Sequence, residues 1–255
     1  MKARIGDRAL AYESIGGGQP LVLVHAFPLD GGMWASIART LADRCRVIVP
    51  DMRGFGASDL GGGDASIADM ADDVAALLDS LGIERATVGG LSMGGYVALA
   101  FATRHRARLE RLILADTRAA ADSEVARAGR ADALALVAKD GVAALVERQL
   151  AALLSPAAGE AVREQVRGLG RQSPEGVSAG IRALRDRPDR RAELSAIRCP
   201  TLVIVGTEDR ISPPAEMAEI ASAIPGARLV EIAGAGHLSN LERPNEFSSA
   251  VAHFI

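Results

Sequence analysis

A serine held between glycines is the strongest chemical signal in the chain. The segment Gly90-Leu91-Ser92-Met93-Gly94 follows the apolar run 86–88 and leads into the alanine-rich run 95–100. A strand that turns at once into a helix holds its serine at a strained corner, where glycine on either side avoids a side-chain collision. The start of the helix directs free N–H groups and the positive end of its dipole at charge that develops nearby. The pattern therefore predicts that Ser92 is a nucleophile.

A serine hydroxyl also needs a base that takes its proton and a third group that orients the base. His237 is the candidate base, because it follows the apolar run 229–232 on the small-residue loop Gly234-Ala235-Gly236. Of the other histidines, His105 falls in the polar end of a predicted helix and His253 in the terminal helix.

Two aspartates are candidates for the acid that orients the base. Asp209 follows the apolar run 202–205, and Asp116 follows the run 112–115. Functional groups of α/β sheets collect at the carboxyl ends of the strands, and both positions fit. Asp116 can equally bond backbone groups, so we favour Asp209 and keep Asp116 as the alternative. Glu208 is one residue nearer the strand and should point elsewhere.

Five segments in register resemble the α/β-hydrolase superfamily over nearly the whole chain. They are His25-Ala26-Phe27-Pro28, Asp51-Met52-Arg53-Gly54-Phe55-Gly56-Ala57-Ser58, Gly90–Gly94, Gly206-Thr207-Glu208-Asp209 and Gly234-Ala235-Gly236-His237. The order Ser, Asp, His is the triad order of that superfamily, and Gly-x-x-Asp is its commoner pattern for the acid. The resemblance implies the α/β-hydrolase fold, with a mostly parallel central sheet of about eight strands, helices on both faces and an inserted helical cap.

The resemblance also implies an oxyanion hole made of backbone N–H groups. By the family rule these belong to Met93, next to the nucleophile, and to Phe27, in the loop after the first parallel strand. The family usually has His-Gly where this chain has His25-Ala26, and alanine fits only if its φ is negative. In relatives the histidine shapes this loop and the segment around Asp51 supports it, so we expect structural roles for both.

The order of elements predicts two structural units. An N-terminal hairpin is expected over 3–15 and a helix over 66–81, with Ser66 as its cap and Gly82 at its end. Short apolar strands alternate with helices on either side of Ser92. The segment 118–194 has helical periodicity, no strand-like run and no aromatic residue or histidine. We expect 1–117 and 195–255 to form the core domain and 118–194 the cap, a bundle of short helices.

The bulk composition excludes several classes of partner. The 255 residues are 49% hydrophobic and 24% charged, with a formal net charge of −3, so we expect neither nucleic acid nor a membrane surface as partner. No signal peptide or spanning segment is visible, and a cytoplasmic location is expected. Cys45 and Cys199 should be free thiols, and we expect no metal and no cofactor. The chain should be a monomer or a homodimer.

The predicted reaction is acyl transfer to water. A serine at the turn from strand to helix argues against haloalkane dehalogenases and epoxide hydrolases, whose nucleophile is a carboxylate. Small or medium uncharged esters should suit a pocket with aliphatic walls, for which the candidates are Leu134, Val137 and Leu145. Trp34 is a further pocket candidate, expected to pack near the pocket mouth.

Three alternatives remain open. The segment Gly236-His237-Leu238-Ser239-Asn240 resembles the 3-oxoadipate enol-lactonase branch, which acts on carboxylate-bearing lactones. An anionic substrate could be bound by arginines of the segment 118–194, although most of these side chains should be solvated ion-pair partners. They are Arg127, Arg130, Arg148, Arg163, Arg167 and Arg171. Pro28, directly after the predicted oxyanion residue Phe27, is also found in cofactor-free haloperoxidases and perhydrolases. We expect their reaction to be a side activity of this chain. A ligand receptor of the same fold would keep the triad without turnover.

Overall fold

The computed structural model describes residues 1–62 and 65–255, and one eight-stranded sheet runs through them in the order β1-β2-β4-β3-β5-β6-β7-β8. The pairs β1–β2 and β2–β4 are antiparallel, and every other neighbouring pair is parallel. The mostly parallel sheet predicted from the sequence is therefore confirmed. The strands are β1 (Lys2–Ile5), β2 (Arg8–Ile15), β3 (Pro20–Val24), β4 (Arg46–Pro50), β5 (Ala86–Leu91), β6 (Leu109–Ala115), β7 (Thr201–Gly206) and β8 (Arg228–Ile232).

The sheet reverses its direction of growth at β3. The chain passes from β3 to β4 on one side and later returns to place β5 on the other side, where Val24 pairs with Gly90. In open α/β sheets such a reversal leaves a crevice outside the carboxyl ends of the two strands. The loops after β3 and β5, which carry Phe27 and Ser92, therefore meet at one edge.

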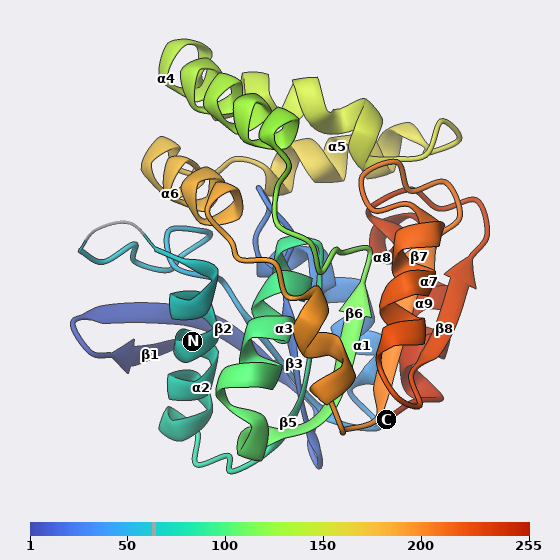
Figure 1. Cartoon of the computed structure of the whole chain (residues 1–255). Coiled ribbons are helices and arrows are strands. Elements are labelled where there is room, and N and C mark those ends of the chain that lie inside the picture. Colours follow the sequence, from blue (N-terminus) through green and yellow to red (C-terminus); the bar gives the residue numbers. More distant parts are fainter. Residues whose placement is uncertain (63–64) are drawn as a thin grey trace.

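Helices cover the sheet, and Figure 1 shows α2 and α3 in front of it and α1 behind. Helix α2 begins at the cap predicted for it: the Ser66 side chain accepts a hydrogen bond from the Asp69 N–H, and the Asp69 carboxylate bonds the Ser66 N–H. Among the described residues, no helix has the length and apolarity needed to cross a bilayer. The α-helices outside the segment between β6 and β7 are α1 (Ala35–Leu41), α2 (Ile67–Ser80), α3 (Met93–Arg104), α7 (Pro214–Ala223), α8 (Ser239–Glu242) and α9 (Pro244–Ala252).

Three helices lie between β6 and β7 and gather beyond one end of the sheet (Figure 1). They are α4 (Glu124–Leu153), α5 (Glu160–Leu169) and α6 (Pro174–Arg185). Helix α4 is longer than the short helices expected here, yet Gly141 has a non-helical φ of 82° and breaks it into two parts. The boundaries assigned to a cap and a core remain predictions.

Helix α6 packs directly on the loops that follow β3 and β4. A Cβ on Gly176 would lie 1.8 Å from the Gly54 carbonyl oxygen, and one on Gly180 would lie 2.8 Å from the Phe55 ring. The Gln172 side chain accepts a hydrogen bond from the Gly56 N–H and donates one to Asp30. The segment between β6 and β7 is thus anchored beside the loop that carries Phe27.

Candidate active site

Ser92 stands at a strained corner between β5 and α3. Its φ of 56° and ψ of −112° lie outside the regions that L-residues ordinarily occupy. A Cβ on Gly94 would lie 2.1 Å from the Val24 carbonyl oxygen, and one on Gly90 would lie 2.3 Å from the Gly94 backbone. Both glycines are therefore required by close backbone approach, as the sequence pattern predicts.

Strand β6 and the segment that follows it fix the backbone of Ser92 on both sides. The Ser92 N–H donates to the Ala115 carbonyl oxygen at 3.0 Å, and the Thr117 hydroxyl donates to the Ser92 carbonyl oxygen at 2.7 Å. A Cβ on Gly95 would meet the Thr117 hydroxyl at 2.4 Å, so this contact also needs a glycine. The role of Thr117 was missed by sequence reasoning, because a threonine after a strand has no distinctive pattern.

His237 and Asp209 are in direct contact. The His237 Nδ1 lies 2.9 Å from the Asp209 Oδ2, and both side chains are almost completely buried. Their loops are also joined through the backbone, since the Glu208 N–H donates to the Ala235 carbonyl oxygen. The structure therefore brings together the two residues predicted as acid and base.

The Asp209 carboxylate is surrounded by hydrogen-bond donors. It accepts from the Ile211 N–H at 2.8 Å, from the Ser212 N–H at 3.0 Å and from the Ser212 hydroxyl at 2.6 Å. Burial by itself raises the pKa of Asp209, but the interactions with His237 and Ser212 outweigh it and the net pKa is lowered. Asp209 is thus suited to remain ionised beside the imidazole. Ser212, which also lies 3.3 Å from the His237 Nδ1, was not anticipated.

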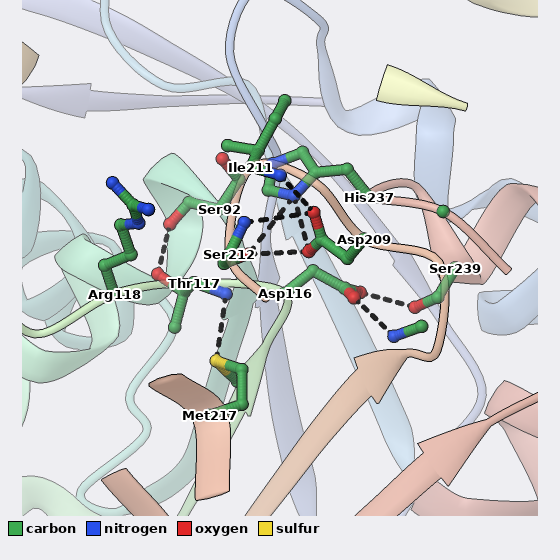
Figure 2. A network of polar contacts seen from close by, with 12 residues as sticks. Ser92, Asp116, Thr117, Arg118, Asp209, Ile211, Ser212, Met217, His237 and Ser239 are labelled. Atoms are coloured by element: carbon green, nitrogen blue, oxygen red, sulfur yellow. Dashed lines mark hydrogen bonds and ion pairs between the residues drawn. The ribbon is translucent and has the colours of Figure 1, made fainter. Parts of the chain in front are cut away.

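Ser92 lies at the same edge of the sheet as this pair, and Figure 2 shows Ser92, Asp209 and His237 in one region. No hydrogen bond joins the Ser92 hydroxyl to His237 in the part of the chain that the structure describes. Catalytic hydrogen bonds are often long without substrate and tighten in the complex, so the arrangement remains compatible with proton transfer.

Asp116 is held away from the imidazole by other partners. It accepts a hydrogen bond from the Gly206 N–H at 2.8 Å, and its second oxygen bonds the Ser239 hydroxyl (Figure 2). Complete burial raises the pKa of Asp116 well above its usual value, and the nearby Asp209 raises it further. This carboxyl group therefore favours its neutral form and links the ends of β6 and β7 to the loop after His237.

The Phe27 and Met93 N–H groups are the donors predicted for the oxyanion hole. Met93 is the first residue of α3, and Phe27 lies in the loop after β3. Within residues 1–62 and 65–255, neither N–H has a hydrogen-bond acceptor. The non-glycine residues with positive φ in these ranges are Ser92 and Asp116, so Ala26 does not need to be glycine. An N–H group without an acceptor is the kind of donor that an oxyanion hole requires.

The loop that carries Phe27 is supported from within by His25. Its Nε2 accepts from the Met52 N–H at 2.9 Å, and its Nδ1 lies 2.9 Å from the Ala26 carbonyl oxygen. Burial lowers the pKa of His25, which favours the neutral imidazole, and both ring nitrogens have a partner. Asp51 holds the same region, because its carboxylate accepts from the Gly31 and Ala57 N–H groups, both at 2.9 Å.

The four pocket candidates are not gathered in one place. Val137 lines an open groove of about 620 Å³ between α4 and α6, together with Leu60, Ala138, Pro174, Glu175, Ser178 and Arg182. Leu134 is partly buried, and Leu145 is fully buried in the core. Trp34 is also fully buried and packs on Phe247 with ring centroids 5.5 Å apart, so its indole lies in the core rather than at a pocket mouth.

Two of the arginines considered for an anion have carboxylate partners. Arg130 pairs with Asp122 at 3.0 Å, and Arg167 pairs with Glu147, Glu160 and Glu164. Asp122 also pairs with the buried Arg187, whose guanidinium lies 4.3 Å from the centre of the Tyr96 ring. Cys45 and Cys199 are free thiols, and the described residues hold no group of three or more side chains suited to a metal ion.

The chain belongs to the α/β-hydrolase fold family, whose sequence profile matches residues 19–244. It is 42% identical to a thermophilic esterase from Thermogutta terrifontis, which superimposes with a TM-score of 0.95 over 99% of this chain and 96% of that one. It is 33% identical to the enol-lactonase from Burkholderia xenovorans LB400, with a TM-score of 0.92 over 100% and 99% of the two chains. It is also 31% identical to 3-oxoadipate enol-lactonase 2 of Acinetobacter baylyi, over 96% of this chain and 92% of the relative. The protein is therefore a hydrolase with esterase and enol-lactonase relatives.

Proposed function

We propose that this protein hydrolyses carboxylic esters of small to medium size through an acyl-enzyme formed on Ser92. The contact between the His237 Nδ1 and the Asp209 Oδ2, at the sheet edge where Ser92 stands at its strained corner, is the observation that carries this proposal. Esterase and enol-lactonase relatives that cover nearly the whole chain support the same class of reaction.

Asp209 determines which nitrogen of His237 acts. A carboxylate that faces Nδ1 keeps the proton on that nitrogen, so Nε2 carries the free lone pair. Nε2 takes the proton of the Ser92 hydroxyl as the oxygen attacks the acyl carbon. The imidazolium then gives this proton to the departing alcohol, and a water molecule repeats the sequence on the acyl-enzyme.

The tetrahedral oxyanion would be stabilised by the Phe27 and Met93 N–H groups. Met93 contributes from the first turn of α3, where the helix dipole is positive, and Phe27 from the loop held by His25 and Asp51. Neither donor bonds another acceptor among the described residues, so neither has to be released before it binds the oxyanion. We further propose that residues 118–194 act as a cap, with α6 seated on the loop of Phe27.

Hydrolysis of p-nitrophenyl acetate tests the proposal. Ser92→Ala should lower kcat by a factor on the order of 10⁶, because the three groups act as a unit. A fluorophosphonate probe should add its mass to Ser92 in the wild type and leave Ser92→Ala unlabelled. Retained turnover in Ser92→Ala would remove this serine from the mechanism, and a single slow burst in the wild type would favour a receptor instead.

Lactone hydrolysis is the second candidate, because two of the relatives are enol-lactonases with 31% and 33% identity. The same triad opens a lactone, with the alcohol remaining attached to the acyl group. A panel of esters and lactones of graded size, with and without a carboxylate, would separate the two functions. A preference for carboxylate-bearing lactones in kcat/KM would replace the ester proposal while leaving the roles of the triad unchanged.

A further inference from the structure

A buried carboxylate that the proposed reaction does not use lies beside the catalytic loop. Glu242 ends the short helix α8, five residues after His237, and is only 8% exposed. No ion pair to Glu242 is present in the described ranges 1–62 and 65–255. A carboxylate without a cation must be satisfied by hydrogen bonds, so its donors indicate what it is for.

These donors come from two segments that are far apart in the sequence. The Glu242 Oε1 accepts from the Gly236 N–H at 2.8 Å and from the Ser155 N–H at 3.1 Å. Its Oε2 accepts from the Ser155 hydroxyl at 2.5 Å and from the Ser155 N–H at 3.2 Å. Gly236 directly precedes His237, and Ser155 follows the C-terminal end of α4. Glu242 therefore joins the loop of the base to the helical segment inserted between β6 and β7.

A second contact holds the other side of the base against the same helix end. The Leu238 N–H donates to the Leu153 carbonyl oxygen at 3.1 Å. The approach is close, because a Cβ on Gly236 would lie 2.5 Å from the Ser155 nitrogen and 2.9 Å from the Glu242 Oε1. The backbone is thus fixed on both sides of His237, at residues 236 and 238.

We propose that Glu242 is a positioning residue that holds His237 against the end of α4. This inference rests on the proposed role of His237 as the base. The C-terminal part of α4, after the break at Gly141, is then part of the support of the triad and not a free lid. The hydrogen bonds of Glu242 to Gly236 and Ser155 are called the bracket below. Because His237 must meet both Asp209 and Ser92, loss of the bracket displaces the base without removing any reacting group. A displacement of about 1 Å costs on the order of 10²-fold in rate.

The experiment compares Glu242→Ala, Glu242→Gln and Ser155→Ala with the control Glu246→Ala, an exposed glutamate four residues further on. Glu242→Ala should lower kcat for p-nitrophenyl acetate about 10²-fold, with KM within about threefold of the wild type. Glu242→Gln should restore most of kcat, because its amide oxygen still accepts from Gly236 and Ser155 and its amide nitrogen can donate to the Ser155 hydroxyl. Glu246→Ala should behave as the wild type.

Ser155→Ala removes one hydrogen bond of the bracket and leaves the base and its loop untouched. It should lower kcat severalfold, and its effect should shrink in the Glu242→Ala background because both act through one contact. The rate at which a fluorophosphonate labels Ser92 should fall in step with kcat, since this rate reports activation of the serine. All rates are measured well below the melting temperature of each variant.

The inference is overturned if Glu242→Ala lowers only the melting temperature while kcat stays unchanged, or if Glu242→Gln is as slow as Glu242→Ala. If Glu242→Ala does not fold, Ser155→Ala decides, and an unchanged kcat and labelling rate reject the bracket. Failure of the proposed function is distinguishable, because it would appear as turnover that persists in Ser92→Ala.

Discussion

Replacement of Asp209 or Asp116 by asparagine tests which of the two carboxyl groups orients His237. In Asp209→Asn the side chain keeps its size but loses its charge, and its amide nitrogen can take the place of the oxygen that faces His237. An N–H₂ group in that place donates to Nδ1, so the proton of the imidazole moves to Nε2. Nε2 then has no lone pair with which to accept the proton of Ser92.

The size of the effect follows from these contacts. Reversal of the tautomer with the geometry kept should lower kcat about 10⁴-fold, which corresponds to about 5 kcal/mol of transition-state stabilisation. In Asp116→Asn the amide oxygen still accepts from the Gly206 N–H, and the amide nitrogen can donate to the Ser239 hydroxyl. An exchange of this kind costs about 1 kcal/mol of stability, and the rate would fall at most roughly fivefold if all of this cost appeared in the transition state.

Steady-state hydrolysis of p-nitrophenyl acetate by both variants measures the difference directly. Circular dichroism spectra and melting temperatures would show that both variants are folded under the assay conditions. We expect Asp209→Asn to be slower than Asp116→Asn by a factor of about 10³. A larger loss in Asp116→Asn would make Asp116 the acid and refute the assignment based on contacts and burial.

Three further changes test the local structure. Gly94→Ala should destabilise the fold by about 3 kcal/mol or more, because its Cβ would lie 2.1 Å from the Val24 carbonyl oxygen. Gly129→Ala, on the open face of α4, should instead stabilise the fold by about 0.5–1 kcal/mol. Urea unfolding of both variants measures this, and similar values for the two would contradict it. Leu145→Ala should cost about 2–5 kcal/mol in the same assay, because the side chain is fully buried, and a cost below 1 kcal/mol would place Leu145 in a looser environment. The raised pKa of Asp116 means that the unfolded chain loses this proton at lower pH than the folded one, so wild-type stability falls as pH rises from about 4 towards the folded-state pKa. Asp116→Asn lacks this titration, and its free energy of unfolding relative to the wild type should increase between pH 4 and pH 8; a constant difference would show that the carboxyl titrates normally.

The elements of the sheet could be predicted because each carries a local signal. Runs such as 21–24 and 202–205 are apolar throughout, as strands covered on both faces must be, and they form β3 and β7. The cap of α2 at Ser66 and its end before Gly82 could be predicted for the same reason, since both depend on residues adjacent in the sequence.

Burial and tertiary contacts could not be predicted in this way. Trp34 was expected near a pocket mouth, yet the side chain packs in the core against Phe247, a residue more than two hundred positions away. Thr117 and Ser212 bond Ser92 and Asp209, but a single hydroxyl after a strand resembles many others that have no such role. Only the folded chain shows that these hydroxyls bond Ser92 and Asp209.

The choice between the two aspartates illustrates why spacing is not sufficient. Both follow a parallel strand at the same edge of the sheet, and both are buried. Asp209 has three donors besides the imidazole, whereas Asp116 has one N–H and one hydroxyl and lies near a second carboxylate. Burial raises the pKa of each carboxyl group. At Asp209 the interactions with His237 and Ser212 overcome this effect, whereas at Asp116 the nearby Asp209 adds to it. The proposed role of Asp209 as the acid therefore depends on His237 and Ser212 as much as on the aspartate itself.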